Sequence, residues 1–169
     1  MLYKSLRVGK EGKKFWMYKL RTLQDNFDKT NSFAKEESYT KWGHTLRKYK
    51  IDELPALINV LKGNMSLVGP RPDEVRTIDL LPEEIKKIIL SVKPGLTSMA
   101  SVYFVDEEEV LKEGEDTFRD YWTRIKPSKV LLDVFYIKNK SWLLDLAIFW
   151  ATLKQIMKIF WDAKIKPRK

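Results

Sequence analysis

The chain has 169 residues, of which 44% are hydrophobic and 33% charged, a size and composition typical of one folded domain. Lysine and arginine outnumber aspartate and glutamate by 32 to 23, so the net charge of +9 favours an anionic partner: a nucleic acid, an acidic membrane leaflet or a phosphorylated substrate. The absence of cysteine excludes disulfides and thiolate metal sites, and the single histidine excludes a multi-histidine metal centre. We expect neither a signal peptide nor a membrane span, because no apolar run approaches about 20 residues.

The first fifty residues predict a short β element followed by a loop. Residues 7–13 are typical of a strand end and a glycine turn, and the alternating aromatic and basic residues of 14–23 predict a strand. Residues 24–40 are polar and aperiodic, which favours a loop or a frayed helix. Residues 42–50 form a short basic segment with helical spacing.

The segment 52–63 predicts a helix that begins with two adjacent acidic residues, Asp52 and Glu53. A proline at position 55 fits the first turn, and Gly63 fits the end of the helix. Four apolar residues at spacing i, i+3, i+4 and i+7 predict one buried stripe: Leu54, Leu57, Ile58 and Leu61. Both carboxylates would then lie at the positive end of the helix dipole.

The segment 65–72 predicts a stiff turn, because its glycine and prolines are incompatible with a helix. Pro70 and Pro72 flank Arg71 and would point its side chain in one direction. Further along, a helix over 82–92, an extended piece over 96–104 and a helix over 106–122 are expected.

The C-terminal third is rich in apolar and aromatic residues at helical spacing: Leu146, Phe149, Trp150, Leu153, Ile156, Met157 and Phe160. This stripe fits a buried core face and equally a helix in the membrane interface, where tryptophans lie beside lysines. Asp145, Lys154 and Lys158 argue against a membrane span. We therefore predict an α+β, mostly helical fold: a compact single domain over residues 1–169 with a short β element and amphipathic membrane-interface helices.

Asp52 and Glu53 have two interpretations. An acidic pair at a helix start usually caps the helix and complements its dipole. A carboxylate can also attack phosphorus and carry a phosphoryl group, and adjacent carboxylates suit Mg²⁺ bridging to substrate phosphates. Such a site needs cations, and the sequence offers Lys19, Arg21, Arg47 and Arg71.

The run from Ile51 to Pro72, IDELPALINVLKGNMSLVGPRP, resembles the signature of the bacterial sugar transferases, the monotopic polyprenyl-phosphate phosphoglycosyl transferases. Shorter matches support the resemblance over essentially the whole chain: RVGK at 7–10, YKLRT at 18–22, Gly43 with Leu46-Arg47, PGLT at 94–97, and Asp133, Tyr136, Ser141, Asp145 and Thr152.

The resemblance implies transfer of a sugar 1-phosphate from a nucleoside diphosphate sugar, such as a UDP-sugar, to a polyprenyl phosphate, initiating surface glycan or exopolysaccharide assembly. It implies Mg²⁺ as cofactor and a location at the cytoplasmic face of the membrane, peripheral or monotopic. Asp52 would be the nucleophile that forms a phosphosugar intermediate, and Glu53 would support metal binding or proton handling. Lys19, Arg21, Arg47, Arg71, Pro70 and Pro72 would form the substrate site.

The chain departs from the family pattern at three points. The usual apolar membrane hairpin does not precede Met1, Phe104 and Val105 stand about where many relatives have a Gly-Arg pair, and the stretch 106–109 is acidic. A non-catalytic relative that binds a membrane or a glycan-assembly partner is thus the first alternative. A nucleic-acid binder is the second, but no recognition motif supports it, and we expect no nucleic acid as partner. A homodimer or a membrane partner stays open.

Overall fold

The structure is a computed structural model that describes residues 2–24, 38–104, 119 and 121–165. It confirms the expected mostly helical α+β domain with a small β element. In chain order the strands are β1 (Leu2–Val8), β2 (Lys14–Leu20), β3 (Ser66–Val68) and β4 (Gly95–Thr97). The α-helices are α1 (Gly43–Lys48), α2 (Leu57–Leu61), α3 (Val75–Asp79), α4 (Glu83–Ile89), α5 (Met99–Tyr103), α8 (Lys126–Lys138) and α9 (Trp142–Ile165). Shorter helical segments are η1 (Lys10–Gly12), η3 (Ile51–Ala56) and η4 (Tyr121–Ile125).

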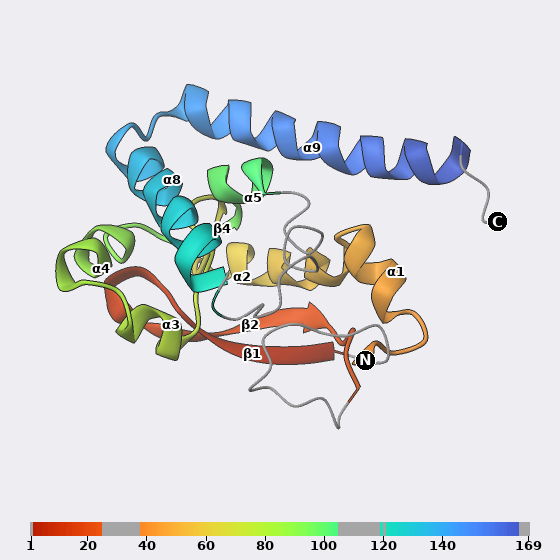
Figure 1. The fold of residues 1–169 in the computed structure, drawn as a ribbon, viewed down its shortest axis with the longest axis horizontal. Coiled ribbons are helices and arrows are strands. Elements are labelled where there is room, and N and C mark those ends of the chain that lie inside the picture. The colour runs from red at the N-terminus through yellow and green to blue at the C-terminus, as the bar shows by residue number, and fades with distance from the viewer. Residues whose placement is uncertain (1, 25–37, 105–118, 120, 166–169) are drawn as a thin grey trace.

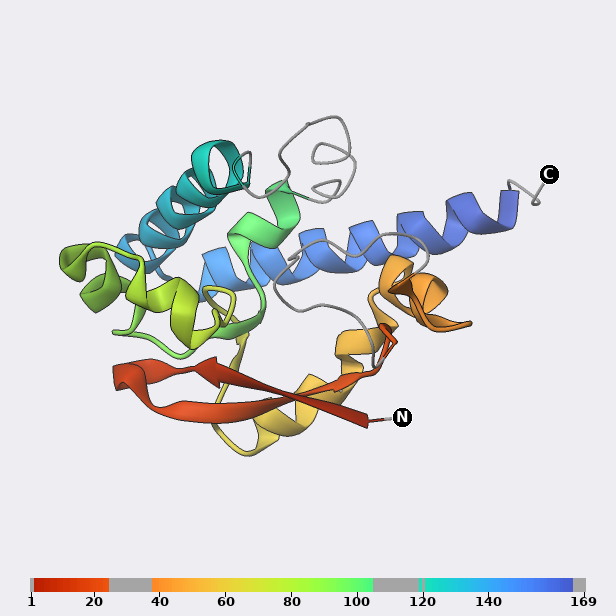
Figure 2. The same ribbon diagram turned by 60° about the horizontal axis from the view of Figure 1, so that its bottom comes forward.

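An antiparallel hairpin of β1 and β2 lies on the opposite side of the domain from α9, which runs along its length (Figure 1). Figure 2 shows η3 and α2 on one side of this hairpin and α3 and α4 on the other. The alternation predicted for β2 is confirmed, because Phe15 and Met17 are buried and Trp16 is exposed. The two buried residues pack with Ala56 and Met65, so the hairpin is fixed against η3.

A second, parallel strand pair fixes the proline-rich turn. Ser66 pairs with Gly95 and Val68 with Thr97. A Cβ atom at Gly95 would lie 2.2 Å from the backbone nitrogen of Gly69, so the close approach of the two chains requires glycine. The predicted stiff turn of 65–72 therefore begins as a strand and bends only after Val68.

Helix α9 is joined to this pair by polar contacts. The hydroxyl of Tyr136 on α8 donates its proton to Asp145 at 2.6 Å, and the carbonyl oxygen of Val68 lies 3.3 Å from the same hydroxyl. The hydroxyls of Thr97 and Thr152 are 2.7 Å apart. The late residues that carry the family resemblance thus connect α8 and α9 to the strands next to the turn.

The predicted burial of the stripe Leu54, Leu57, Ile58 and Leu61 is wrong, because all four side chains are exposed, Leu61 to 88%. The opposite face is buried, and it carries Asp52, Ala56 and Asn59. Helical spacing gives the period of an amphipathic face but does not say whether that face meets a core or another apolar phase. The helix start at the acidic pair and the stop at Gly63, whose φ is 76°, are confirmed.

The extended piece predicted for 96–104 is only partly correct. Strand β4 ends at Thr97, and α5 begins at Met99 because the Ser98 hydroxyl caps it by accepting a hydrogen bond from the Ser101 N–H at 3.0 Å. The predicted helix over 82–92 is confirmed as α4. Most of the predicted helix over 106–122, most of the predicted loop over 24–40, Val105 and the acidic stretch after it lie outside the described residues.

The fold generates a first prediction, at Asn59, whose side chain is fully buried. Its Oδ1 accepts from the Tyr18 N–H at 3.0 Å and its Nδ2 donates to the Trp16 carbonyl at 2.8 Å. Asn59→Leu leaves both backbone groups without a hydrogen-bond partner, so the free energy of unfolding should fall by roughly 2–6 kcal/mol. Urea denaturation measures this. The control Asn64→Leu replaces an exposed asparagine; equal losses in both variants would contradict the assigned role.

Candidate active site

Asp52 and Glu53 lie in the first turn of η3, where the sequence placed them. The preceding residue Lys50 adopts a left-handed conformation with φ of 58°, which turns the chain sharply between α1 and η3. The turn directs Asp52 into the domain, where only 7% of the residue is exposed. An acidic pair that merely capped the helix would stay in water, so this burial requires another explanation.

Glu53 is held by two cations from distant segments. Lys19, at the end of β2, donates to Oε1 at 2.9 Å, and Arg71 Nη1 donates to Oε2 at 3.1 Å. Arg71 Nη2 donates to Oε1 as well, so the arginine contact is bidentate. Burial alone would raise the pKa of Glu53, but Arg71 and Lys19 outweigh it and hold the pKa well below its usual range. Glu53 is therefore ionised.

Asp52 differs from its neighbour. The described residues offer its carboxylate neither a hydrogen bond nor an ion pair, although cations lie around it. Burial raises the pKa of Asp52 and the charge of Glu53 raises it further, while Lys19, Arg47 and Arg71 oppose both effects. The site thus contains one carboxylate that is clamped and one that is available for chemistry.

Lys19 and Arg71 are the predicted substrate-site cations that the structure brings into direct contact with the acidic pair. Arg47 lies close enough to lower the pKa of Asp52 and also donates to the Tyr39 hydroxyl at 3.3 Å. Arg21 lies over the ring of Tyr3, with 5.7 Å between its Cζ atom and the ring centre. The structure thus brings Lys19 and Arg71 to the acidic pair and Arg47 near it, whereas Arg21 contacts Tyr3 and its place in the substrate site stays a prediction.

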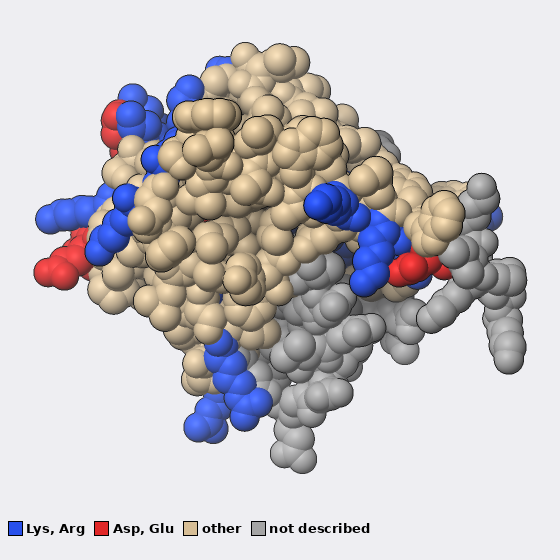
Figure 3. Space-filling view, turned by 90° about the horizontal axis from the view of Figure 1, so that it is seen from above, with Lys and Arg blue, Asp and Glu red and all other residues tan. Residues whose placement is uncertain are grey.

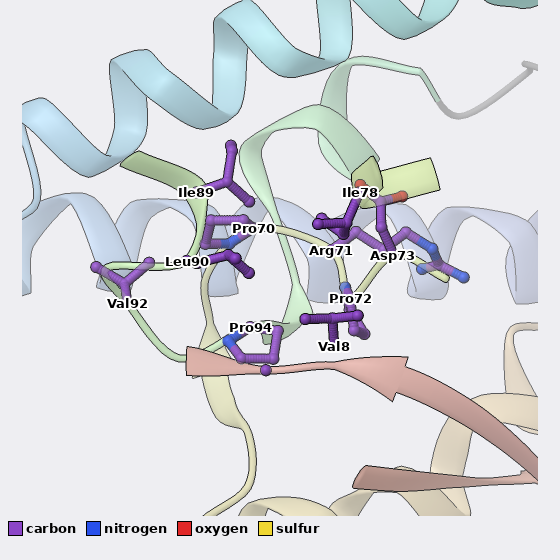
Figure 4. Close-up of a pocket in the computed structure, with 11 residues that line it drawn as sticks. Val8, Pro70, Arg71, Pro72, Asp73, Ile78, Ile89, Leu90, Val92 and Pro94 are labelled. Carbon is purple, nitrogen blue, oxygen red and sulfur yellow. The ribbon is translucent and has the colours of Figure 1, made fainter. Parts of the chain in front are cut away.

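Figure 4 shows the turn that carries Arg71, with Pro70 and Pro72 among apolar side chains and Arg71 extending away from them. Both prolines are buried, and the Pro70 carbonyl accepts from the Gly95 N–H at 2.8 Å. The cavity between them measures about 10 Å³, the space of roughly one water. The prolines therefore support the turn, and their contact with a substrate stays a prediction.

Arg7 is a charged residue that the sequence analysis did not assign to the site. It pairs with Glu74 at 3.1 Å, and its positive charge lies near both Arg71 and Glu53. Burial lowers the pKa of Arg7, and the neighbouring Arg71 lowers it further, although Glu74 opposes both. Its position in the RVGK match was the only available signal, since strand alternation does not distinguish a site residue from a surface one.

Asp133 on α8 is a second buried acid. It is 9% exposed, and its Oδ1 has no hydrogen-bond partner. Burial raises its pKa to about 7, with Asp73 contributing and Lys126 opposing. The other late residues of the resemblance have structural partners: Tyr136 binds Asp145, Thr152 contacts Thr97, and the Ser141 hydroxyl accepts from the Leu144 N–H. Asp133 is the exception among them.

The expected Mg²⁺ has a restricted set of ligands here. Over the described part of the chain, no group of three or more Asp, Glu or His side chains is placed to hold a metal ion. The carboxylate of Asp52 fits Mg²⁺, which takes one or two protein carboxylates and completes its shell with water and substrate phosphates. Glu53 fits only if Lys19 or Arg71 releases an oxygen, because both of its oxygens accept hydrogen bonds.

Comparison with known proteins identifies the class to which this fold and site belong. The family model described as bacterial sugar transferase matches residues 1–159. The chain therefore belongs to the bacterial sugar transferase family, and the resemblance found in the sequence is confirmed.

Individual relatives extend the comparison. The chain is 39% identical over 160 residues to the uncharacterized sugar transferase EpsL of Bacillus subtilis, covering 93% of this chain and 70% of that protein. It is 36% identical to UDP-N-acetylgalactosamine-undecaprenyl-phosphate N-acetylgalactosaminephosphotransferase of Aeromonas hydrophila, over 91% of this chain and 34% of that protein. It is 33% identical to UDP-glucose:undecaprenyl-phosphate glucose-1-phosphate transferase of Klebsiella pneumoniae, over 90% and 32%. The chain thus spans only about a third of the latter two relatives.

The site generates a second prediction, at Asp133. Between about pH 4 and pH 7 the folded protein keeps a proton that the unfolded chain releases, because the pKa rises from 3.8 to about 7 on folding. The free energy of unfolding should therefore fall as the pH rises through this window, by up to about 1.4 kcal/mol per pH unit. Asp133→Asn should remove that slope.

Urea denaturation at intervals from pH 4.5 to 8 measures the slope in both proteins. Asp79→Asn, which replaces an exposed aspartate on α3, is the control and should keep the wild-type slope. An Asp133→Asn variant with the wild-type slope would show that the acid titrates normally.

Proposed function

We propose that this chain transfers a sugar 1-phosphate from a nucleoside diphosphate sugar to a polyprenyl phosphate, with Asp52 as the covalent nucleophile. The observation that carries the proposal is that two adjacent carboxylates, one buried and one largely buried, have different partners. Glu53 is clamped by Lys19 and Arg71, whereas Asp52 has no ion pair within the described residues. The names of the Aeromonas and Klebsiella relatives describe transferases that use undecaprenyl phosphate, which supports the same substrate class.

The proposed reaction has two displacements at one phosphorus atom. A carboxylate oxygen of Asp52 attacks the phosphorus that bears the sugar, an O–P bond forms, and the bond to the nucleoside phosphate breaks, so nucleoside monophosphate leaves with the electron pair. A phosphate oxygen of the polyprenyl phosphate then attacks the same phosphorus. This step breaks the Asp52–phosphorus bond, restores the carboxylate and yields a polyprenyl diphosphate sugar.

Lys19, Arg47 and Arg71 supply the positive charge that such a substrate needs. A diphosphate would be repelled by two carboxylates, but these three cations outnumber them. Arg71 is the partner of Glu53 that reaches solvent, with 45% of its side chain exposed, so it can bind an incoming phosphate and Glu53 together. A bound Mg²⁺ held by Asp52 would further neutralise phosphate charge.

A membrane surface is part of the proposal, because the acceptor is a lipid. Within the described residues, no helix is both long enough and apolar enough to span a bilayer. Helix α9 nevertheless exposes large apolar side chains along its length: Trp142, Leu143, Leu146, Trp150, Met157, Phe160 and Trp161. Figure 3 looks onto this face and shows a broad uncharged area with Lys and Arg side chains around it. We propose that this face lies against the lipid headgroups, on the cytoplasmic side.

The third prediction tests the nucleophile. Asp52→Asn removes the attacking charge while preserving side-chain shape, so turnover should stop without a change in fold. Full-length protein in nanodiscs is incubated with Mg²⁺, undecaprenyl phosphate and a panel of UDP-sugars, and release of UMP is measured. Intact-mass spectrometry with donor alone should show a phosphosugar adduct on wild type and none on the variant.

The control for this experiment is Asp79→Asn, which changes an exposed aspartate and should react like wild type. Near-normal turnover of Asp52→Asn would overturn the covalent mechanism. Absence of UMP release by wild type with every donor would overturn the proposed activity and favour the non-catalytic alternative.

The fourth prediction concerns Arg71. Arg71→Ala removes a charge-assisted contact to substrate phosphate, worth about 1.5–3 kcal/mol, so kcat/KM for the donor should fall roughly 10- to 100-fold. Lys19 still donates to Glu53, and water can reach the place that the half-exposed arginine leaves, so the protein should stay folded with a moderately lower melting temperature. Arg76→Ala, an exposed arginine on α3, is the matched control. A large loss of thermal stability with normal kinetics would assign Arg71 a structural role.

A further inference from the structure

A second pair of charged groups lies behind Arg71, between the turn and α8. Asp73 accepts a hydrogen bond from Lys126 Nζ at 2.6 Å. Lys126 is the first residue of α8, and only 7% of its side chain is exposed. Exposed pairs of this kind contribute little, but a buried pair is costly to break because one charge is left without compensation. This contact therefore fixes the position of Asp73.

The turn is also attached to β1. The Val8 N–H donates to the Asp73 carbonyl at 3.1 Å, and Arg7 pairs with Glu74 at 3.1 Å. Three nearby residues, one in the turn and two directly after it, therefore bind three different elements: Arg71 binds η3, Asp73 binds α8 and Glu74 binds β1. Figure 4 shows Arg71 and Asp73 extending from the turn in different directions. A shift of Asp73 must move the backbone that carries Arg71.

We propose that Lys126 is a positioning residue for the transfer reaction: by holding Asp73 it fixes the turn and keeps the Arg71 guanidinium against Glu53. The inference rests on the proposed function for its catalytic consequence, while the contact it describes is independent of that function. Lys126 acts through Asp73 and makes no contact with the acidic pair within the described residues.

Asp133 completes the surroundings of this lysine. Lys126 and Asp133 are two helical turns apart on α8 and so lie on one face of the helix. The charges that act on Asp133 are Asp73, Lys126, Lys129 and Arg71. Burial and Asp73 raise the pKa of Asp133 to about 7, so Asp133 is largely protonated and uncharged in mildly acidic solution. Under these conditions it does not compete with Asp73 for the positive charge of Lys126.

The fifth prediction uses two variants of Lys126 and one control. Lys126→Met keeps the length of the side chain without its charge, and Lys126→Arg restores the charge. Lys86→Met removes a lysine whose pair with Glu83, at 3.0 Å, lies on α4 away from the turn. In the nanodisc assay, Lys126→Met should lower kcat about 10- to 100-fold with a smaller change in KM, as expected for a misplaced catalytic group. Lys126→Arg should recover most of the activity, and Lys86→Met should match wild type.

A second readout does not depend on activity. In protein labelled with ¹⁵N-arginine, the Arg71 guanidinium signal, assigned with Arg71→Lys, reports its contact with Glu53. Lys126→Met should shift or broaden this signal, and Lys86→Met should not. An unchanged signal overturns the positioning role even if wild type transfers no sugar phosphate, and a normal kcat in Lys126→Met overturns it for an active enzyme. If Lys126→Met does not fold, Asp73→Asn, which preserves shape and an acceptor oxygen, is tested by the same two measurements.

Discussion

A buried carboxylate stays ionised only when cations replace the water that it has lost, and Glu53 meets this condition through Lys19 and Arg71. The rest of the structure is arranged around that requirement. The two cations are 52 residues apart in the sequence, so neither a local turn nor a single helix brings them to one carboxylate. Lys19 lies on strand β2, Arg71 lies on the turn after β3, and Glu53 lies on η3 between them.

Lys19 and Arg71 are positioned in different ways. Lys19 is placed by a regular hairpin whose buried residues pack against η3, and Asn59 fixes the same strand through two backbone contacts. Arg71 has no strand of its own and depends on a turn in which a Cβ atom at Gly95 would clash with Gly69. An arginine on a flexible segment would lose conformational entropy each time it binds a substrate. Arg71 lies on a turn held by several contacts, so most of this entropy is already lost on folding.

Much of this arrangement was predictable because it depends on local chemistry. Alternation in 14–23, the acidic start of η3, the stop at Gly63 and the rigid turn around Arg71 all follow from backbone preferences. The orientation of η3 and α2 was not predictable, because Leu54, Leu57, Ile58 and Leu61 have the spacing of a core face but lie at the surface. These four residues are exposed because Asp52 and Asn59 lie on the face of the helix that is buried. A prediction that considers only the apolar pattern therefore takes the exposed face for the buried one. The Lys126–Asp73 pair was equally inaccessible, since it joins residues 53 positions apart.

The same clamp on Glu53 explains why the adjacent acid is suited to chemistry. If Lys19 and Arg71 were shared equally between Asp52 and Glu53, each carboxylate would be stabilised as a partner and neither would be a good nucleophile. Both cations donate to Glu53, while Asp52 feels them only through space and has its pKa raised by burial. The exposed Arg71 can then contact an incoming phosphate while it keeps its contact with Glu53, whereas the side chain of Lys19 is largely buried against Glu53. The proposed substrate would therefore meet an exposed arginine that is already held in place, a buried lysine that fixes Glu53, and the carboxylate of Asp52, which has no ion pair within the described residues.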